Sequence, residues 1–282
     1  MPMAQTHDLT CAGRVVARYV WEPDLPATVS PRPYLHPVTT LGGTTVTGFM
    51  PDDHLHHLGA SIAVPAVNGA NFWGGRTYLR GRGSVHLENH GRQRHSRWLH
   101  RTGAHLVQEL HWAGRDGRVL AQEQRTLRTE PVADTAWMLS IAYALSSADG
   151  RPLIIHSPAV RGRAGAGYGG FFWRAPAGPD PVRAFARTGG GEAHGSRDPW
   201  VALGTAAWTL VFHTVAAADD PWFVRSADYA GVCSAIAWDR PLIIAPGQVF
   251  ARRISVVVAD GPPTPATTAT ALAAFDLEHP PE

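Results

Sequence analysis

Three histidines and two carboxylates lie together in residues 51–59, Pro-Asp-Asp-His-Leu-His-His-Leu-Gly. Histidine has an unperturbed pKa of about 6.5, so an imidazole beside Asp53 suits general acid or base chemistry near neutral pH. The candidate imidazoles are those of His54, His56 and His57. In an extended strand, His54 and His56 would project to one side and present a pair of metal ligands. The remaining alternative is a solvated polar loop whose histidines have no role.

Charged residues on otherwise apolar strand faces form a second group of candidates. In residues 119–128, strand alternation places Glu123 and Arg125 on a face with three apolar residues, and residues 250–258 place Arg252 in the same way. Burying one such charge alone costs several kcal/mol, so each should either pair with an opposite charge or serve a site. Glu123 is therefore our candidate for a base opposing the histidines, with a buried salt bridge as the alternative.

Glycine-rich bends and aromatic strands supply candidates for ligand contact. Residues 165–174 join a glycine-rich bend to an aromatic run, and residues 213–225 combine histidine, tryptophan and arginine. Small residues let the backbone approach a ligand, and indole rings pack well against the C–H faces of sugars. Each segment is equally compatible with a turn that enters a core strand. The candidates from these patterns are Trp73, Arg174, His213, Trp222 and Arg225.

Several well-known catalytic motifs are missing from the sequence. It contains no G-x-S-x-G nucleophile elbow, no dinucleotide-binding fingerprint and no H-E-x-x-H. We therefore predict no cofactor, while a histidine-bound divalent metal stays open as an alternative. Such a site would combine His54 and His56 with a distant imidazole, for example His86 or His213.

Composition and charge exclude several classes of partner. The chain has 25 Lys and Arg against 23 Asp and Glu, a net charge of +2, and its arginines are not clustered, so we predict no nucleic-acid partner. It lacks an apolar run of about 18 residues and a basic start followed by an apolar segment, which predicts a cytoplasmic protein without membrane contact. Two cysteines do not make a disulfide framework. Nothing in these features determines the oligomeric state.

The distribution of glycine and proline predicts an all-β fold. The 29 glycines and 23 prolines interrupt the chain often, which favours many short strands over long helices. Strands are predicted over residues 14–21, 106–112, 119–128, 136–145, 153–156, 207–215 and 250–259, the second and third forming a hairpin. A short C-terminal helix is predicted over residues 266–275. We expect a disordered N-terminal tail at residues 1–12 and a single β-sandwich domain at residues 13–282.

Several of these motifs resemble the PmoA-like ("methane oxygenase PmoA") family of bacterial proteins. In order they are Arg-Pro-Tyr-Leu-His-Pro at 32–37, Asp-His-Leu-His-His-Leu-Gly at 53–59, Val-Asn-Gly-Ala-Asn-Phe-Trp at 67–73, and weaker segments at 169–174, 212–213, 221–225 and 246–248. The resemblance spans roughly residues 14–260. This chain departs from the family pattern at Leu55 and Leu58, where Pro and Arg are expected.

The resemblance implies a large β supersandwich similar to galactose mutarotase. Proteins with this fold typically bind carbohydrate on a concave sheet lined by His, Glu, Arg and aromatic side chains, so it implies a small, sugar-like substrate. With the motif residues added, the candidate substrate contacts are Arg32, His36, Trp73, His86, Arg174, His213, Trp222 and Arg225.

The leading hypothesis is an enzyme that acts on a carbohydrate or a glycosylated small molecule by acid–base chemistry, of the epimerase, lyase or hydrolase type. One histidine of the segment would be the acid or base, oriented by Asp53, and Glu123 would be the opposing base. Two alternatives remain: a histidine-ligated metalloprotein or oxidoreductase, and a non-catalytic sugar-binding module. The sequence does not identify the substrate or the reaction.

Overall fold

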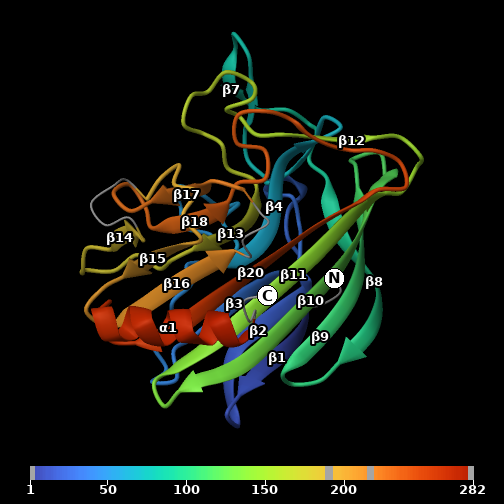
Figure 1. Ribbon diagram of the computed structural model, residues 1–282. Helices are drawn as coiled ribbons and strands as arrows, with labels where there is room; N and C mark the ends of the chain where they lie inside the picture. The colour runs from blue at the N-terminus through green and yellow to red at the C-terminus, as the bar shows by residue number, and fades with distance from the viewer. Residues whose placement is uncertain (1–3, 188–192, 215–218, 279–282) are drawn as a thin grey trace.

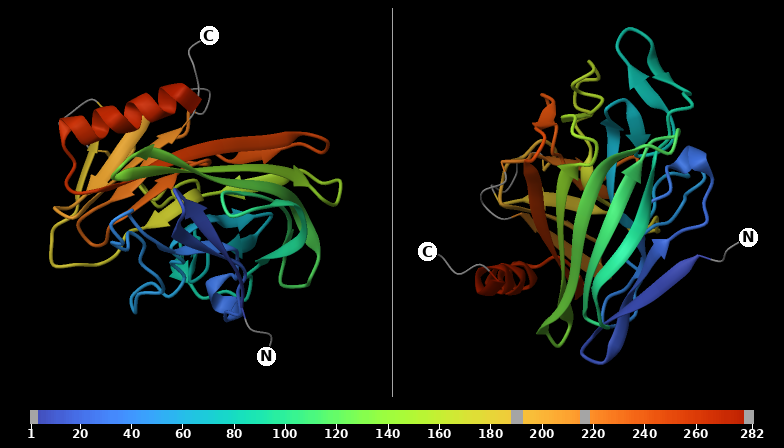
Figure 2. Two further views of the ribbon diagram at one scale, coloured as in Figure 1. Left: turned by 90° about the horizontal axis from the view of Figure 1, so that it is seen from below. Right: turned by 90° about the vertical axis from the view of Figure 1, so that its right-hand side faces the viewer.

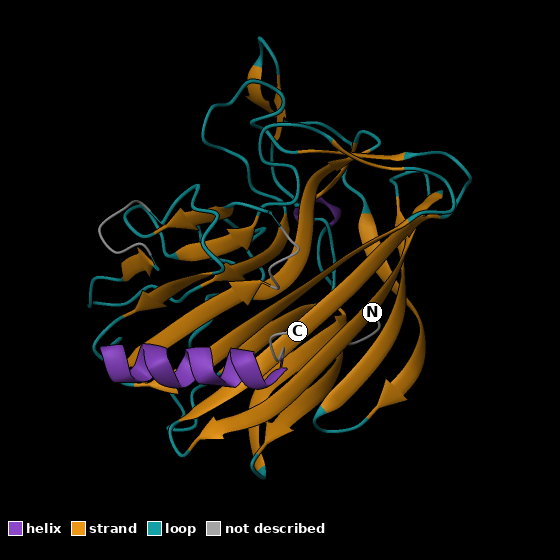
Figure 3. Ribbon diagram, viewed as in Figure 1, coloured by secondary structure: helices purple, strands orange, loops and turns teal. Residues whose placement is uncertain are grey.

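Two antiparallel sheets pack face to face and form the body of the protein (Figure 1). The computed structural model describes residues 4–187, 193–214 and 219–278. Within these residues the chain is almost entirely strand and loop, with one short 3-10 turn, η1 (Ala27–Val29), and one α-helix, α1 (Pro265–Glu278) (Figure 3). The predicted β-sandwich with a short C-terminal helix is confirmed.

The first sheet contains ten of the described strands. They are β1 (Gln5–Cys11), β2 (Arg14–Glu22), β3 (Tyr34–Val38), β4 (Ala60–Val67), β5 (Ala70–Phe72), β12 (Leu153–His156), β13 (Gly170–Arg174), β17 (Trp222–Arg225), β18 (Gly231–Ser234) and β19 (Leu242–Ile244). The main path runs β1-β2-β3-β4-β13-β18-β17, and β5 and β12 also pair with β4. Strands distant in sequence therefore meet at β4, which lies beside the loop that contains the histidines.

The second sheet contains eight described strands in the order β14-β15-β16-β20-β11-β10-β9-β8. They are β8 (Arg92–Arg101), β9 (His105–Ala113), β10 (Val119–Ala133), β11 (Ala136–Ser147), β14 (Arg183–Ala186), β15 (Trp200–Gly204), β16 (Trp208–Thr214) and β20 (Val249–Asp260). The predicted hairpin is present as β9 and β10, whose register pairs Leu110 with Glu123. A small ribbon of β6 (Thr77–Leu79) and β7 (Gly83–Val85) projects beyond the sandwich (Figure 2).

Alternation along the central strands creates two different environments on the faces of the ten-stranded sheet. On β4, Ile62 and Val64 enter the main core between the sheets, whereas Ala63 faces the opposite side. On β13, Trp173 enters the main core and Phe172 joins the outer side. The sheet therefore has an inner apolar face and an outer face with its own aromatic cluster.

Helix α1 covers the outer face of the eight-stranded sheet, away from the ten-stranded sheet (Figure 2). Its Ala271 and Phe275 are buried against Val211 of β16 and Val257 of β20. No helix in the described part of the chain is long and apolar enough to cross a membrane.

The N-terminal residues differ from the prediction. Residues 5–11 form β1, which pairs with β2, so the predicted disordered tail is wrong over this segment. This segment is ordered because Leu9 and Cys11 are buried in the main core, and because the Thr10 amide donates a hydrogen bond to the Gly103 carbonyl. Cys11 and Cys233 are both buried free thiols.

Glu123 and Arg125 form a buried ion pair between the sheets. Their side chains are almost fully inaccessible, and Arg125 Nε lies 2.6 Å from Glu123 Oε1. Trp112 donates its indole N–H to Glu123, and Arg125 also donates to the Gln93 side-chain carbonyl at 2.9 Å. The other arginine on an apolar face, Arg252, pairs with Asp220 at 2.5 Å. Both satisfy the rule that a buried charge needs a partner.

The buried pair generates a stability prediction. We expect Glu123→Gln to lower the free energy of unfolding by about 3 kcal/mol, because it leaves the Arg125 charge buried without its counter-charge. Urea unfolding monitored by tryptophan fluorescence measures the change. The matched control is Glu109→Gln, which breaks the exposed pair with Arg97 and should cost far less because water screens that pair. Equal losses in the two variants would contradict the assignment.

Candidate active site

The loop between β3 and β4 gathers the three histidines into one cluster. Two consecutive turns shape it: the His54 amide donates to the Pro51 carbonyl at 2.8 Å, and the His57 amide donates to the His54 carbonyl at 2.9 Å. The segment is therefore not the extended strand considered for metal binding, and His57 is not directed away from the other two. The His54 and His57 rings stack with centroids 4.5 Å apart, and the His56 and His57 centroids are 4.8 Å apart.

The histidine cluster rests on the outer face of the ten-stranded sheet. The buried residues of this face and the aromatic side chains packed against them form the outer aromatic cluster, which contains Trp73, Tyr168, Phe172, Phe223, Tyr229 and Trp238. The His57 ring contacts Phe172 at 4.8 Å and Tyr229 at 5.2 Å between centroids. Tyr229 also lies 5.3 Å from the His54 ring. The imidazoles are thus held by rings from β13, the β5 end and the β17–β18 loop.

A guanidinium from β13 reaches the same cluster. Arg174 Nη1 lies 3.3 Å from His57 Nδ1, and its guanidinium carbon lies 4.4 Å from the centre of the Tyr229 ring. Arg174 is 5% exposed, and this burial lowers its pKa. A guanidinium can only donate, so His57 Nδ1 accepts and the His57 proton is placed on Nε2.

Asp53 and His54 form the most accessible acid–base pair of the site. Asp53 Oδ2 lies 2.8 Å from His54 Nδ1, and the Asp53 and His54 side chains are 60% and 34% exposed. The hydrogen bond to His54 lowers the pKa of Asp53, so the carboxylate is charged. At this distance the carboxylate is close enough to orient the His54 imidazole.

His56 and His57 are kept neutral by their surroundings. Burial is the main cause, followed by nearby positive groups, and together they lower the pKa of His56 to about 3 and lower that of His57 still further. His56 packs tightly against Gly75, where an added Cβ would lie 2.8 Å from the imidazole Nδ1. The neighbouring Gly74 has a φ of 101°, a conformation that glycine adopts readily.

Arg32 anchors the histidine loop through hydrogen bonds to main-chain carbonyls. This 1% exposed side chain donates to the carbonyls of Val29, Ser30 and Trp73 at 3.0–3.1 Å. It also donates to the His56 carbonyl at 2.8 Å. The Arg32 guanidinium is occupied with the main chain of three separate segments, so it positions the site and does not face a ligand. Burial lowers the pKa of Arg32 to about 9.

Six of the residues predicted from the sequence meet in this cluster: Asp53, His54, His56, His57, Trp73 and Arg174. Arg225 lies on the same outer face, with its guanidinium 4.5 Å from the Phe223 ring centre. Of the two departures from the family pattern, Leu55 is 51% exposed beside the histidines, whereas Leu58 is fully buried against Val20 and Tyr34.

Glu123 and Trp222 are not brought to the histidines. Glu123 points into the core between the sheets, whereas the histidines lie on the opposite face of the ten-stranded sheet. It therefore cannot be the opposing base, because a layer of strands separates it from the cluster. Trp222 is also fully buried in the main core and donates its indole N–H to the Asp198 carbonyl at 2.9 Å. No face of that ring is open to a sugar.

The remaining predicted histidines lie elsewhere. His213 stacks on Phe275 of α1 with ring centroids 4.5 Å apart, on the outer face of the other sheet. His86 is exposed and lies 3.2 Å from Arg76 Nε. His36 stacks on Phe49 and lies 3.0 Å from the Thr47 hydroxyl. These placements do not support a metal site that joins His54 and His56 to His86 or His213.

The geometry of the cluster also disfavours a divalent cation. Among the described residues, no three His, Cys, Asp or Glu side chains are arranged to hold a metal ion. Two ring nitrogens face other partners, His54 Nδ1 toward Asp53 and His57 Nδ1 toward Arg174. A cation beside His57 would also be repelled by the Arg174 guanidinium.

Sequence reasoning missed three contributors to the site. Tyr229 contacts His54, His57 and Arg174, yet it comes from a loop without a recognisable pattern. Tyr168, within the glycine-rich bend, packs against Trp73 with the two ring centroids 4.6 Å apart. His90 lies 2.8 Å from the Gly75 carbonyl and contributes to the lowered pKa of His56. Only the glycine-rich bend carried a sequence signal, so Tyr168 alone was open to prediction.

A comparison with models of protein families identifies the family of this chain. A model described as a family of unknown function, DUF6807, matches residues 6–273. The chain belongs to the DUF6807 family. This description carries no PmoA-like name, so the assignment to that family is replaced by DUF6807. No curated protein matches the chain.

Two solved structures are similar to this DUF6807 protein. One is a putative aldose 1-epimerase from Escherichia coli K12, with 10% identity and a TM-score of 0.47, covering 91% of this chain and 99% of that one. The other is an α-galactosidase from Lactobacillus brevis, with 9% identity and a TM-score of 0.45. That similarity covers 93% of this chain and 41% of the α-galactosidase, so the chain spans less than half of that protein.

The neutral histidines generate a prediction about pH. Unfolded His56 binds a proton with a pKa near 6.5, whereas folded His56 has a pKa of about 3, so its contribution is complete above the unfolded pKa and is lost as the pH falls. At about pH 5 this should cost about 2 kcal/mol relative to about pH 7.5, measured by urea unfolding at both values. His56→Gln should weaken this pH dependence, and His100→Gln, at an exposed position, should change it much less. A His56→Gln protein with the wild-type pH dependence would refute the assignment.

Proposed function

We propose that this protein is an enzyme that acts on a carbohydrate or a glycosylated small molecule, with His54 as its general base or acid. The observation that carries the proposal is the Asp53–His54 pair, which lies at the accessible side of an otherwise buried cluster of imidazoles, aromatic rings and a guanidinium. The reaction is of the epimerase, lyase or hydrolase type.

The proposed mechanism assigns the proton transfer to one ring nitrogen. His54 Nε2 accepts a proton from the substrate, and the Asp53 carboxylate stabilises the imidazolium that forms. His56 and His57 do not take part as bases, because burial keeps both neutral across the physiological range. Their role is to support the His54 ring and to keep water away from its inner side.

A sugar is the substrate class that best fits the rim of the site. The His54 ring and the half-buried Tyr229 ring are 5.3 Å apart, and Leu55 is exposed beside them. Rings of this kind pack against the C–H face of a sugar while its hydroxyls remain free for polar contacts. Arg174 lies 3.3 Å from His57, and Arg225 lies further along the same face, so both are candidates for contact with hydroxyl or carboxylate oxygens.

The alternative function, a non-catalytic sugar-binding module, is supported by the burial of the aromatic rings beneath the histidines. Trp73 and Phe172 are at most 5% exposed and serve as a platform beneath the histidines, not as open stacking surfaces. A sugar-binding module would use this platform without proton transfer. It predicts that a sugar ligand binds and is recovered unchanged.

The test is a substrate screen followed by two variants. Free aldoses are followed by polarimetry and aryl glycosides by release of the aryl group. We expect His54→Ala to lower kcat about 100-fold or more against the substrate found, because it removes the base itself. Asp53→Asn should lower kcat about tenfold, because the base remains but loses the carboxylate that orients it. His100→Ala is the control at an exposed site.

Two results would remove the mechanism. One is full activity of His54→Ala with an unchanged unfolding midpoint. The other is a sugar that binds tightly to the wild-type protein and shows no turnover, which would assign the chain to the binding modules.

A further inference from the structure

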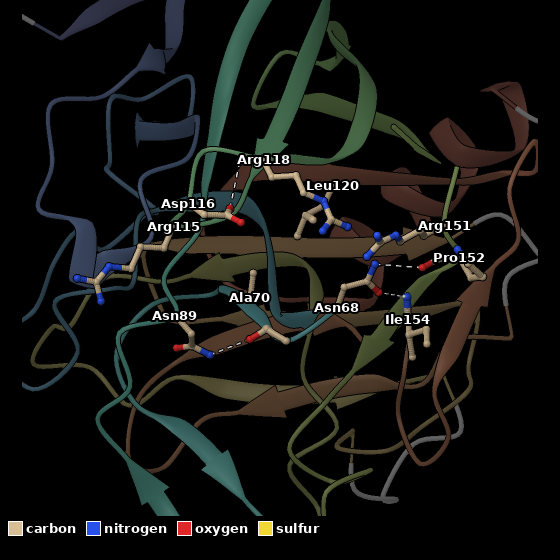
Figure 4. A pocket seen from close by; sticks show the side chains of 12 residues that line it. Asn68, Ala70, Asn89, Arg115, Asp116, Arg118, Leu120, Arg151, Pro152 and Ile154 are labelled. Atoms are coloured by element: carbon tan, nitrogen blue, oxygen red, sulfur yellow. Dashed lines mark hydrogen bonds between the residues drawn. The ribbon is translucent and has the colours of Figure 1, made fainter. Parts of the chain in front are cut away.

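A cleft of about 680 Å³ lies at the end of the sandwich where three turns meet (Figure 4). Its lining comes from the β4–β5 turn with Asn68, the β9–β10 turn with Asp116 and Arg118, and the β11–β12 turn with Arg151. None of its lining residues belongs to the histidine site. Volumes of this size accommodate small organic ligands.

Asp149 links the two turns that carry the arginines. Its carboxylate accepts from the Arg118 guanidinium, with the Nε donor at 3.0 Å, and from the Arg151 main-chain amide at 3.0 Å. The Asp149 side chain is 18% exposed, so this anchor is mostly shielded from water. The Arg118 head group is therefore positioned before any ligand arrives, which reduces the entropy lost on binding.

The amide side chains hold the floor of the cleft and do not face a ligand. Asn68 donates to the Pro152 carbonyl at 3.0 Å and accepts from the Ile154 amide at 2.7 Å. Asn89 donates to the Gly69 carbonyl at 2.9 Å. Both amides are thus committed to the turns, and the free polar groups of the cleft belong to its charged residues.

Two guanidinium groups converge on this cleft. Arg118 and Arg151 point toward one another, whereas Arg115 points away toward its partner Glu88 (Figure 4). Arg151 makes no side-chain hydrogen bond to any described residue, and its charge, like that of Arg118, helps to lower the pKa of Asp149. The Arg118 guanidinium is paired with Asp149, whereas the donors of the facing Arg151 guanidinium remain available for an anionic ligand.

The rest of the lining suits a hydroxylated molecule. Asp116 accepts from the Arg118 amide through Oδ1 at 3.1 Å, and its second oxygen is available to accept from a hydroxyl. Ala70, Leu120 and Pro152 supply apolar surface beside these charges. The combination of paired guanidiniums, an acceptor and an apolar wall matches an oxyanion attached to a sugar ring.

We propose that this cleft binds a small acidic sugar whose carboxylate or phosphate bridges Arg118 and Arg151. The inference does not depend on the proposed catalytic role of His54. It assigns the cleft to recognition of a charged ligand.

Calorimetric titration with three probes tests the proposal: glucuronate, a glucose monophosphate and glucose. We expect at least one charged probe to bind, glucose not to bind, and added salt to weaken the binding. The two charged probes distinguish a carboxylate from a phosphate ligand. Failure of both to bind at about 10 mM, or equal binding of glucose, would overturn the proposal.

Three single substitutions test whether the charged probe binds in this cleft. Arg151→Ala should weaken the charged probe about tenfold or more without changing the unfolding midpoint, because its side chain has no hydrogen bond to lose. Arg115→Ala, the control on the neighbouring turn, should change affinity less than about twofold. His54→Ala should bind the probe as the wild type does. Wild-type affinity in Arg151→Ala, or lost affinity in His54→Ala, would refute the assignment.

Discussion

The pleat of the ten-stranded sheet is the constraint on which the rest of this structure depends. Successive side chains of β4 and β13 point to opposite faces of the sheet. Ile62 and Trp173 therefore pack in the main core, while Ala63 and Phe172 lie on the outer face beneath the histidine cluster. A shift of one residue in either strand would exchange the two environments. The same alternation separates the buried Glu123–Arg125 pair from the histidines, although all are polar groups near the middle of the molecule.

A second constraint is the satisfaction of buried main-chain groups by Arg32. Loops that pass under a site leave carbonyls without partners, and a buried arginine provides five donors in a fixed plane. Arg32 uses them to join the carbonyls of Val29, Trp73 and His56. The positive charge that remains beneath the loop helps to keep His56 neutral, so the same side chain fixes the geometry of the cluster and its protonation.

The two proposed sites differ in their electrostatic design. At the histidine cluster, burial keeps His56 and His57 neutral, and the accessible Asp53–His54 pair is the proposed site of proton transfer. At the cleft near Asp149, the guanidiniums remain partly exposed and charged, and the turns hold them together. The histidine cluster therefore suits proton transfer to or from a neutral substrate, whereas the cleft suits recognition of an anion.

The sequence by itself determined the β-sandwich, the β9–β10 hairpin and the C-terminal helix, because these follow from local patterns of turns and alternation. It also required Glu123 and Arg125 to be buried as a pair or used in a site, but alternation does not reveal which sheet face meets which partner. Tertiary structure alone decided that Glu123 faces the core, that Tyr229 joins the histidines, and that β1 is ordered. These depend on contacts between segments far apart in the chain, which no local pattern encodes.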